Sequence, residues 1–311
     1  MIGSVGNVGV GYGSRVGRSA STFATALAFW GGGMGAWAYS RGGYQAVSVP
    51  GQWLGRQPAA NQALLIPLFL LAVGSSGLIV NRLGAVFLRF VEGDWPRSTV
   101  PLYHRLVARR TRRALAEDRA WEQARRDFDS SPTLTARLVV TRNVLDRRRR
   151  YRPAYPNFLL PTKVGNILRA AEIRVAEKYG LANDVVWPRL LLVLPEPAAS
   201  RVTAARRAVD RAVATVVWGL LFCAFAALTP LVVPIGLAVA AIALLVAVPA
   251  RVRDLTDLME SVYDLHRNEL YRQLRWPLPM NPGEDRAQGV RVSDYLRNGL
   301  NAAEPLFTTP S

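Results

Sequence analysis

Cysteine, histidine and lysine are nearly absent from this chain of 311 residues, which has one, two and two of them. The single cysteine, Cys223, excludes an intrachain disulfide and a thiol-based zinc site. His104 and His266 have no cysteine nearby, so neither predicts a metal site. Hydrolase, zinc-protease and P-loop signatures are missing as well. The sequence therefore predicts no enzyme and no cofactor.

Charge is missing from residues 212–250, which contain no Asp, Glu, Lys, Arg or His. One helical membrane span needs roughly 20 residues, so this stretch of 39 residues is long enough for two. Thr229 and Pro230 stand at its midpoint, where one helix is expected to stop and another to start. We therefore predict spans at about 209–228 and 231–250 that form a hairpin.

Two earlier stretches are also free of charge, at 21–39 and 63–80. The second is rich in leucine and predicts a span that reaches the interface before the Gly-Asp-Trp-Pro turn at 93–96. The first is rich in glycine, and a cleaved signal peptide is the alternative to a retained span. Glycine pairs predict close helix packing in both stretches. These glycines are Gly31, Gly35, Gly74 and Gly77.

Arginines gather at one end of every predicted span, whereas the two presumed external connections hold only Arg41 and Arg56. By the positive-inside rule both termini are cytoplasmic. The bias of the 39 basic residues toward arginine, with many alanines, favours a bacterial source and hence the plasma membrane. The net charge of +17 is explained by basic loops against an anionic leaflet, and nucleic acid is not the expected partner.

The predicted fold is mostly α: an integral membrane protein with four transmembrane helices in two hairpins and an inserted helical cytoplasmic domain. The segments are a disordered N-terminus at 1–20, hairpin 1 at 21–92, an arginine-rich cytoplasmic helical domain at 93–208, hairpin 2 at 209–250, and an amphipathic helix and tail at 251–311. Within the tail, Ser293 is expected to cap a last short helix. The C-terminal helix is expected to pack on the central domain.

The central region carries the strongest charge feature, because fifteen arginines face six acids between His104 and Arg152. Such charges attract anionic lipid headgroups or a partner protein. Residues 101–128 have helical apolar spacing, and 135–141 fit either a helix or a short strand. The arginines predicted to contact the membrane surface or a partner are Arg109, Arg110, Arg112, Arg113, Arg147, Arg148, Arg149 and Arg150.

Residues 160–195 form the most densely patterned polar stretch. Thr162 is expected to cap a helix that ends at Gly180. This stretch predicts a compact helical core, with a docking groove or a small-ligand site as the alternative.

Two functions stay open from the sequence. The first is a membrane anchor or adaptor that presents a basic helical domain to a protein partner or a larger assembly, and a homo-oligomer is compatible with it. The second is a transporter or channel subunit. Transport is less favoured because the predicted spans carry no ionisable residue of the kind that lines substrate pathways.

Overall fold

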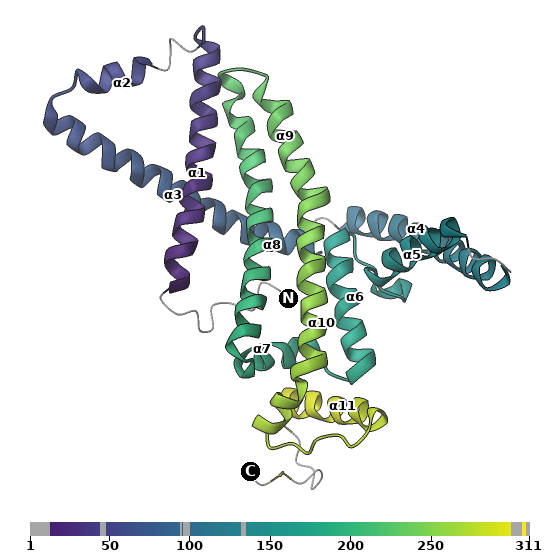
Figure 1. The fold of residues 1–311 in the computed structure, drawn as a ribbon. Helices are drawn as coiled ribbons and strands as arrows, with labels where there is room; N and C mark the ends of the chain where they lie inside the picture. The colour runs from purple at the N-terminus through teal and green to yellow at the C-terminus, as the bar shows by residue number, and fades with distance from the viewer. Residues whose placement is uncertain are drawn as a thin grey trace. The chain divides into compact units, whose positions relative to one another are not determined.

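The computed structural model describes residues 13–43, 48–93, 95, 100–131, 135–299 and 307–308, with residues 13–24 described by their backbone alone. In these residues helices are joined by short connections and no strand occurs, which confirms the mostly α class (Figure 1). The strand alternative at 135–141 is wrong. The Thr135 hydroxyl accepts a hydrogen bond from the Leu138 amide (3.5 Å) and caps a helix there. A helix satisfies its own backbone hydrogen bonds, whereas a strand needs a partner strand.

The long helices lie in the apolar stretches and in the arginine-rich region. In chain order the elements are α1 (Gly13–Ser40), α2 (Ser48–Gly55), α3 (Ala59–Glu92), α4 (Val100–Ser130), α5 (Ala136–Arg150), a 3-10 turn (Pro156–Phe158), α6 (Lys163–Tyr179), α7 (Asn183–Val193), α8 (Glu196–Phe222), a 3-10 turn (Cys223–Ala227), α9 (Val232–Ile242), a π turn (Ala243–Ala247), α10 (Val248–Gln273) and α11 (Pro282–Asn298).

Three helical stretches are long and apolar enough to cross a membrane: Ala59–Glu92, Glu196–Ala227 and Val232–Gln273. Only 17% of the most apolar 18-residue segment of α3 is buried, so most of its side chains are available to contact lipid. The helix α1 is not among the three, because four glycines and two tryptophans lower the mean hydropathy of its apolar stretch at 21–39. The chain is thus a membrane protein by these three helices, while four spans in two hairpins are not confirmed.

Contacts within the chain divide it into two compact units. Among the described residues, the apolar unit lies within 13–88 and 209–248, and the polar unit lies within 89–208 and 249–308. Each unit is therefore built from segments that are distant in the sequence.

In the apolar unit, α1, α3 and α8 share a core. Ala26, Val73, Val80, Val217 and Trp218 are buried together in it. The Trp30 indole donates a hydrogen bond to the Ser76 hydroxyl (3.2 Å), which satisfies a polar group that lipid could not.

The helices α8 and α9 lie side by side and are joined by the turn predicted at Thr229 and Pro230 (Figure 1). Their backbones approach at two glycines. A Cβ added at Gly219 would lie 2.8 Å from the Ala240 amide nitrogen, and one at Gly236 would lie 2.6 Å from the Gly219 carbonyl oxygen. Small residues give this close contact, as they do between helices in membranes generally.

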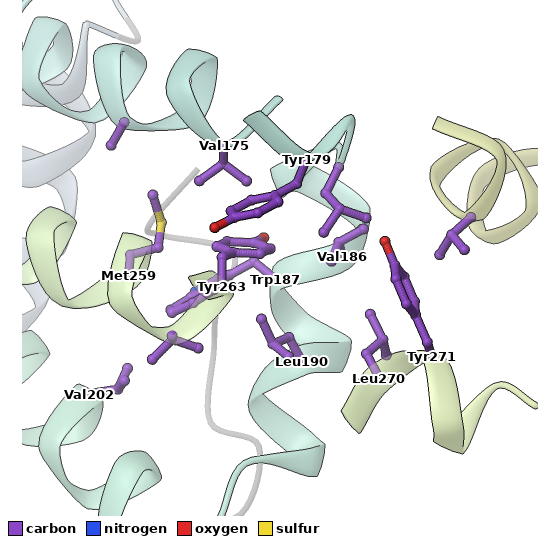
Figure 2. Close-up of a cluster of buried hydrophobic side chains, with 14 of the residues drawn as sticks. Val175, Tyr179, Val186, Trp187, Leu190, Val202, Met259, Tyr263, Leu270 and Tyr271 are labelled. Carbon is purple, nitrogen blue, oxygen red and sulfur yellow. The ribbon is translucent and has the colours of Figure 1, made fainter. Parts of the chain in front are cut away.

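The core of the polar unit combines α6 and α7 with α10 and α11, which lie on the other side of the apolar stretch in the sequence. Figure 2 shows Val175, Trp187 and Tyr263 pointing toward one centre. The Tyr263 hydroxyl donates to the Asn183 side chain (3.0 Å), so this fully buried phenol keeps a partner. The expected packing of the C-terminal helix on the central region is confirmed.

Helix ends were predicted well where a cap is local. The Thr162 hydroxyl accepts from the Gly165 amide (3.0 Å), and Gly180 ends α6 with a φ of +68°. The prediction for Ser293 is wrong. Asn281 caps α11, and Ser293 lies inside it, where its hydroxyl accepts from the Ala182 amide (2.9 Å) and donates to the Gly289 carbonyl (2.8 Å).

Two expectations near the N-terminus need correction. The helix α1 begins at Gly13, before the predicted boundary at 21, because the polar residues that precede the apolar stretch are compatible with helix. The short helix α2 lies in the region expected to be a loop, with Pro50 in its first turn, where proline is tolerated. The disorder predicted for 1–12 falls outside the described residues.

Candidate functional site

A cavity of about 320 Å³ opens in the polar unit where α4, the end of α5, the start of α6 and α10 meet. Apolar side chains of α4 and α6, among them Ala114 and Ile167, form part of its wall. Its remaining lining is mostly basic. The polar side chains that face it are Arg110, Arg113, Glu117, Arg148, Tyr151, Arg152, Lys163, Asn166 and Arg253.

The loop before α6 is fixed by Asn166, whose side chain is 5% exposed. Its amide group donates to the carbonyls of Leu160 (2.8 Å) and Thr162 (2.7 Å), and its oxygen accepts from the Leu160 amide (2.8 Å). The Arg110 Nε donates to the next carbonyl, that of Pro161 (2.7 Å), and so ties α4 to this loop. The cavity wall on this side is therefore set by hydrogen bonds to backbone.

On the opposite side Arg152 is largely buried and charge-compensated. Its guanidinium pairs with Asp118, lies 3.5 Å from the Glu117 carboxylate, and donates to the Ala114 carbonyl (3.3 Å). Arg152 thus stabilises the contact between α4 and the linker that follows α5.

The neighbouring Tyr151 links the same linker to α10. Its hydroxyl donates to Asp257 (2.6 Å), while the Arg253 guanidinium lies over its ring at 5.0 Å from the centroid. Burial and the Asp257 carboxylate both raise the pKa of Tyr151, so the phenol stays protonated and keeps donating.

The other five bases differ from Arg152, because none of them pairs with a carboxylate in the described part of the chain. They are Arg110, Arg113, Arg148, Lys163 and Arg253. Burial lowers the pKa of Lys163, and the charges of Arg253 and Arg110 lower it further. Burial followed by repulsion from Arg113 and Arg109 likewise lowers the pKa of Arg110. The cavity thus concentrates positive charge without compensating it.

A second hollow, between α6 and α10, has the opposite character. Its bases Arg174 and Lys178 are paired with Glu260 and Asp264, the latter pair at 2.8 Å. Since every base there has an acid, this hollow is explained as an ion-paired seam between two helices. The first cavity, whose bases lack such acids, is therefore the candidate site.

The predicted arginines separate into different roles. Arg149 lies over the Trp121 ring at 4.0 Å and pairs with Asp118 at 3.6 Å, and Arg150 pairs with Glu260 at 3.2 Å, so both hold the polar unit together. Arg109, Arg112 and Arg147 are exposed. Arg110, Arg113 and Arg148 line the cavity.

Three of the four predicted packing glycines make no close contact with the described residues. A Cβ added at Gly31, Gly35 or Gly74 would meet no atom within 4 Å, and Gly77 is buried. Their role in packing against another copy or another protein stays a prediction. The close approach at Gly219 and Gly236 was missed, because two glycines 17 residues apart on different helices form no sequence motif.

Lys163 and Arg253 are two unpaired bases of the cavity that the sequence did not predict as site residues. The lining residues Glu117, Tyr151, Arg152 and Asn166 were not predicted either. One signal was available, since Lys163 is one of only two lysines in a chain that otherwise uses arginine.

Comparison of the chain with protein-family models, with curated proteins and with solved structures finds no match.

Proposed function

We propose that this protein is a multi-pass membrane anchor that presents the basic helix pair α4–α5 to an acidic surface of a protein partner. It inserts through two hairpins of two spans each and keeps both termini in the cytoplasm of a bacterial cell, at the plasma membrane. The polar unit is then the cytoplasmic part, and anionic lipid headgroups lie beside it.

The observation that carries this proposal is how little of α4–α5 is buried. Ala114 is the only buried residue of α4, and the fully described α5 has none. Apolar side chains nevertheless stand exposed on both helices, including Leu115 (43%), Val140 (59%) and Val144 (45%). Helices gain most of their stability from packing an apolar face, so a pair with this exposure is suited to docking.

Contacts within the pair keep it together without a large core. The Trp121 indole donates to Asp146 on α5 (2.5 Å), and Arg142 lies over the Phe128 ring at 4.3 Å. The pair therefore has a defined shape, while apolar side chains such as Val140 and Val144 stay exposed on it.

Charge indicates the chemistry of the partner. The exposed Arg137 and Arg147 have no acid of their own among the described residues, and they belong to the region in which fifteen arginines face six acids. An acidic protein surface complements this excess and speeds association, whereas a basic one is repelled. Transport is less well supported, because residues 212–250 and 63–80 offer no ionisable side chain for a substrate path.

Photo-crosslinking on the full chain in intact cells tests the proposal. A photoreactive residue at Val140 or Val144 should give a discrete protein adduct, and one at Val290 on α11, which is exposed to a similar extent (47%), should not. The double reversal Arg137→Glu with Arg147→Glu should reduce the adduct about tenfold, since close charge pairs at interfaces contribute on the order of 1.5 kcal/mol or more.

The control is Arg137→Gln with Arg147→Gln, which removes charge without reversing it and should give an intermediate loss. Lipid adducts alone at Val140 and Val144 would replace the protein partner with the membrane surface. Equal yields at all three positions would reject α4–α5 as the docking surface.

A further inference from the structure

The basic cavity of the polar unit calls for an explanation of its own, which the adaptor role does not supply. Six of its lining residues are basic and one, Glu117, is acidic. Arg152 is neutralised by Glu117 and Asp118, so the excess rests on the five other bases. Buried or crowded charges are normally paired, because like charges brought together oppose folding.

Arg253 is the sharpest case. Its Nε is buried and has no hydrogen-bond partner among the described residues, although the guanidinium belongs to the cavity wall. A buried donor without a partner costs stability unless a ligand or water supplies an acceptor. Lys163 lines the same cavity and remains open to solvent, so a ligand can reach it.

The geometry also limits which acceptor could bind Arg253. The cavity of about 320 Å³ is at the small end of ligand sites, which suits one small charged group better than an extended polymer. Guanidinium forks bind phosphate oxygens in a bidentate way, and a lysine ammonium adds a point charge. A group with two or more negative charges would compensate several of the five bases at once.

We propose that this cavity binds a phosphomonoester or diphosphate group, carried by a small soluble molecule or by a lipid headgroup. Arg253 and Lys163 bind its oxygens from α10 and α6, and Arg110 contributes from α4. Arg113 and Arg148, which are exposed, attract the anion at the entrance. The inference does not depend on the protein partner proposed above.

Titration of the purified full-length protein with inorganic pyrophosphate, in a non-ionic detergent and at constant ionic strength, tests the site by calorimetry. The wild type should bind at a single site. Arg253→Gln and Lys163→Gln should each weaken binding about tenfold or more, because each removes a charge-assisted hydrogen bond. The matched control is Arg147→Gln, the same loss of charge one residue from Arg148 but outside the cavity, and it should leave binding within about twofold.

Thermal unfolding gives a readout that a purely structural role would not produce. Without ligand, Arg253→Gln and Lys163→Gln should melt at or above the wild-type temperature, since they relieve repulsion. They should also lose most of the upward shift that pyrophosphate gives the wild type. If Arg253→Gln melts at a lower temperature than wild type, the double variant Arg113→Gln with Arg148→Gln replaces it as the test. Both positions are exposed, and the double variant should also weaken pyrophosphate binding.

Vesicle lipids distinguish the two sources of the group. If phosphatidic acid in a phosphatidylcholine nanodisc competes with pyrophosphate, the natural ligand is a headgroup; if it does not, the ligand is soluble. Either result supports the site. The proposal is overturned if the wild type binds neither pyrophosphate nor phosphatidic acid, or if Arg147→Gln loses as much affinity as Arg253→Gln.

Discussion

At the scale of single residues, Glu172 on α6 should oppose folding at neutral pH. Its carboxylate is 18% exposed and has Arg169 at 3.3 Å. Burial raises the pKa of Glu172, and Arg169 offsets this only in part. The folded state thus holds the proton more tightly than the unfolded chain, so stability is complete below the ordinary pKa of glutamate and falls as pH rises through the raised value.

Glu172→Gln removes this penalty and should stabilise the full chain at pH 7 by about 1 kcal/mol, the gain usual for a corrected charge site. Melting temperatures measured from pH 4 to pH 8 check it, and the advantage over wild type should disappear toward pH 4. Glu177→Gln, on the exposed side of the same helix, is the matched control and should change little. A destabilised Glu172→Gln at pH 7 would mean that the ion pair with Arg169 outweighs burial.

Residue-level prediction from the sequence succeeded where the physics is local. Thr162 and Gly180 act within a few residues of themselves, so the sequence was sufficient for both. Ser293 looked equally local, but the hydroxyl serves Ala182, more than a hundred residues away. The cavity could not be predicted from the sequence for the same reason, because Arg110 and Arg253 line one cavity only after α4 and α10 have packed.

At the scale of elements, the contact between α8 and α9 leaves no room for a larger side chain. Gly236→Val would push a side chain against the Gly219 carbonyl, 2.6 Å from an added Cβ, and against the Cys223 sulfur at 2.9 Å. We expect a loss of about 1 to 3 kcal/mol, the usual cost of overpacking, seen as a lower melting temperature in detergent.

The matched substitution in another apolar helix is Gly74→Val, because an added Cβ there would meet no atom of the described residues within 4 Å. It should leave the melting temperature of the monomer near that of wild type. If it instead changes the apparent mass in detergent, Gly74 packs against a second copy, and the predicted role of the glycines in helix packing is confirmed. A Gly236→Val protein as stable as wild type would contradict the close contact.

Elements were predicted from hydrophobic pattern with mixed results. The turn at Thr229 and Pro230 and the helix over the arginine-rich region follow from residues that act nearby. Residues 135–141 were ambiguous because their β-branched residues suit either state, and they lie in a helix where the described residues include no strand to pair with. The span at 21–39 is the weakest because glycine lowers hydropathy without preventing a helix.

At the scale of the whole molecule, the uneven distribution of arginines along the chain predicts which side of the membrane each segment faces. The chain passes between the apolar and the polar unit at 88–89, 208–209 and 248–249, each time within a helix, so these three points should lie on one side of the membrane. By the positive-inside rule, the arginines near these points predict that this side is the cytoplasm. The side of the amino end depends on whether α1 crosses.

Single cysteines in a Cys223→Ala background test this topology with an impermeant thiol reagent on intact cells. Gln52→Cys on α2 should be labelled, and Gln123→Cys on α4 should be labelled only after the cells are opened; both positions are exposed. If α1 is a span, Ser4→Cys should behave like Gln123→Cys. Labelling of Ser4→Cys on intact cells would leave three spans. An intact mass that corresponds to a chain beginning near residue 39 would show a cleaved signal peptide. Labelling of Gln123→Cys on intact cells would overturn the orientation. The last outcome would also remove the cytoplasmic partner from the proposed function, because α4–α5 would then face the other compartment.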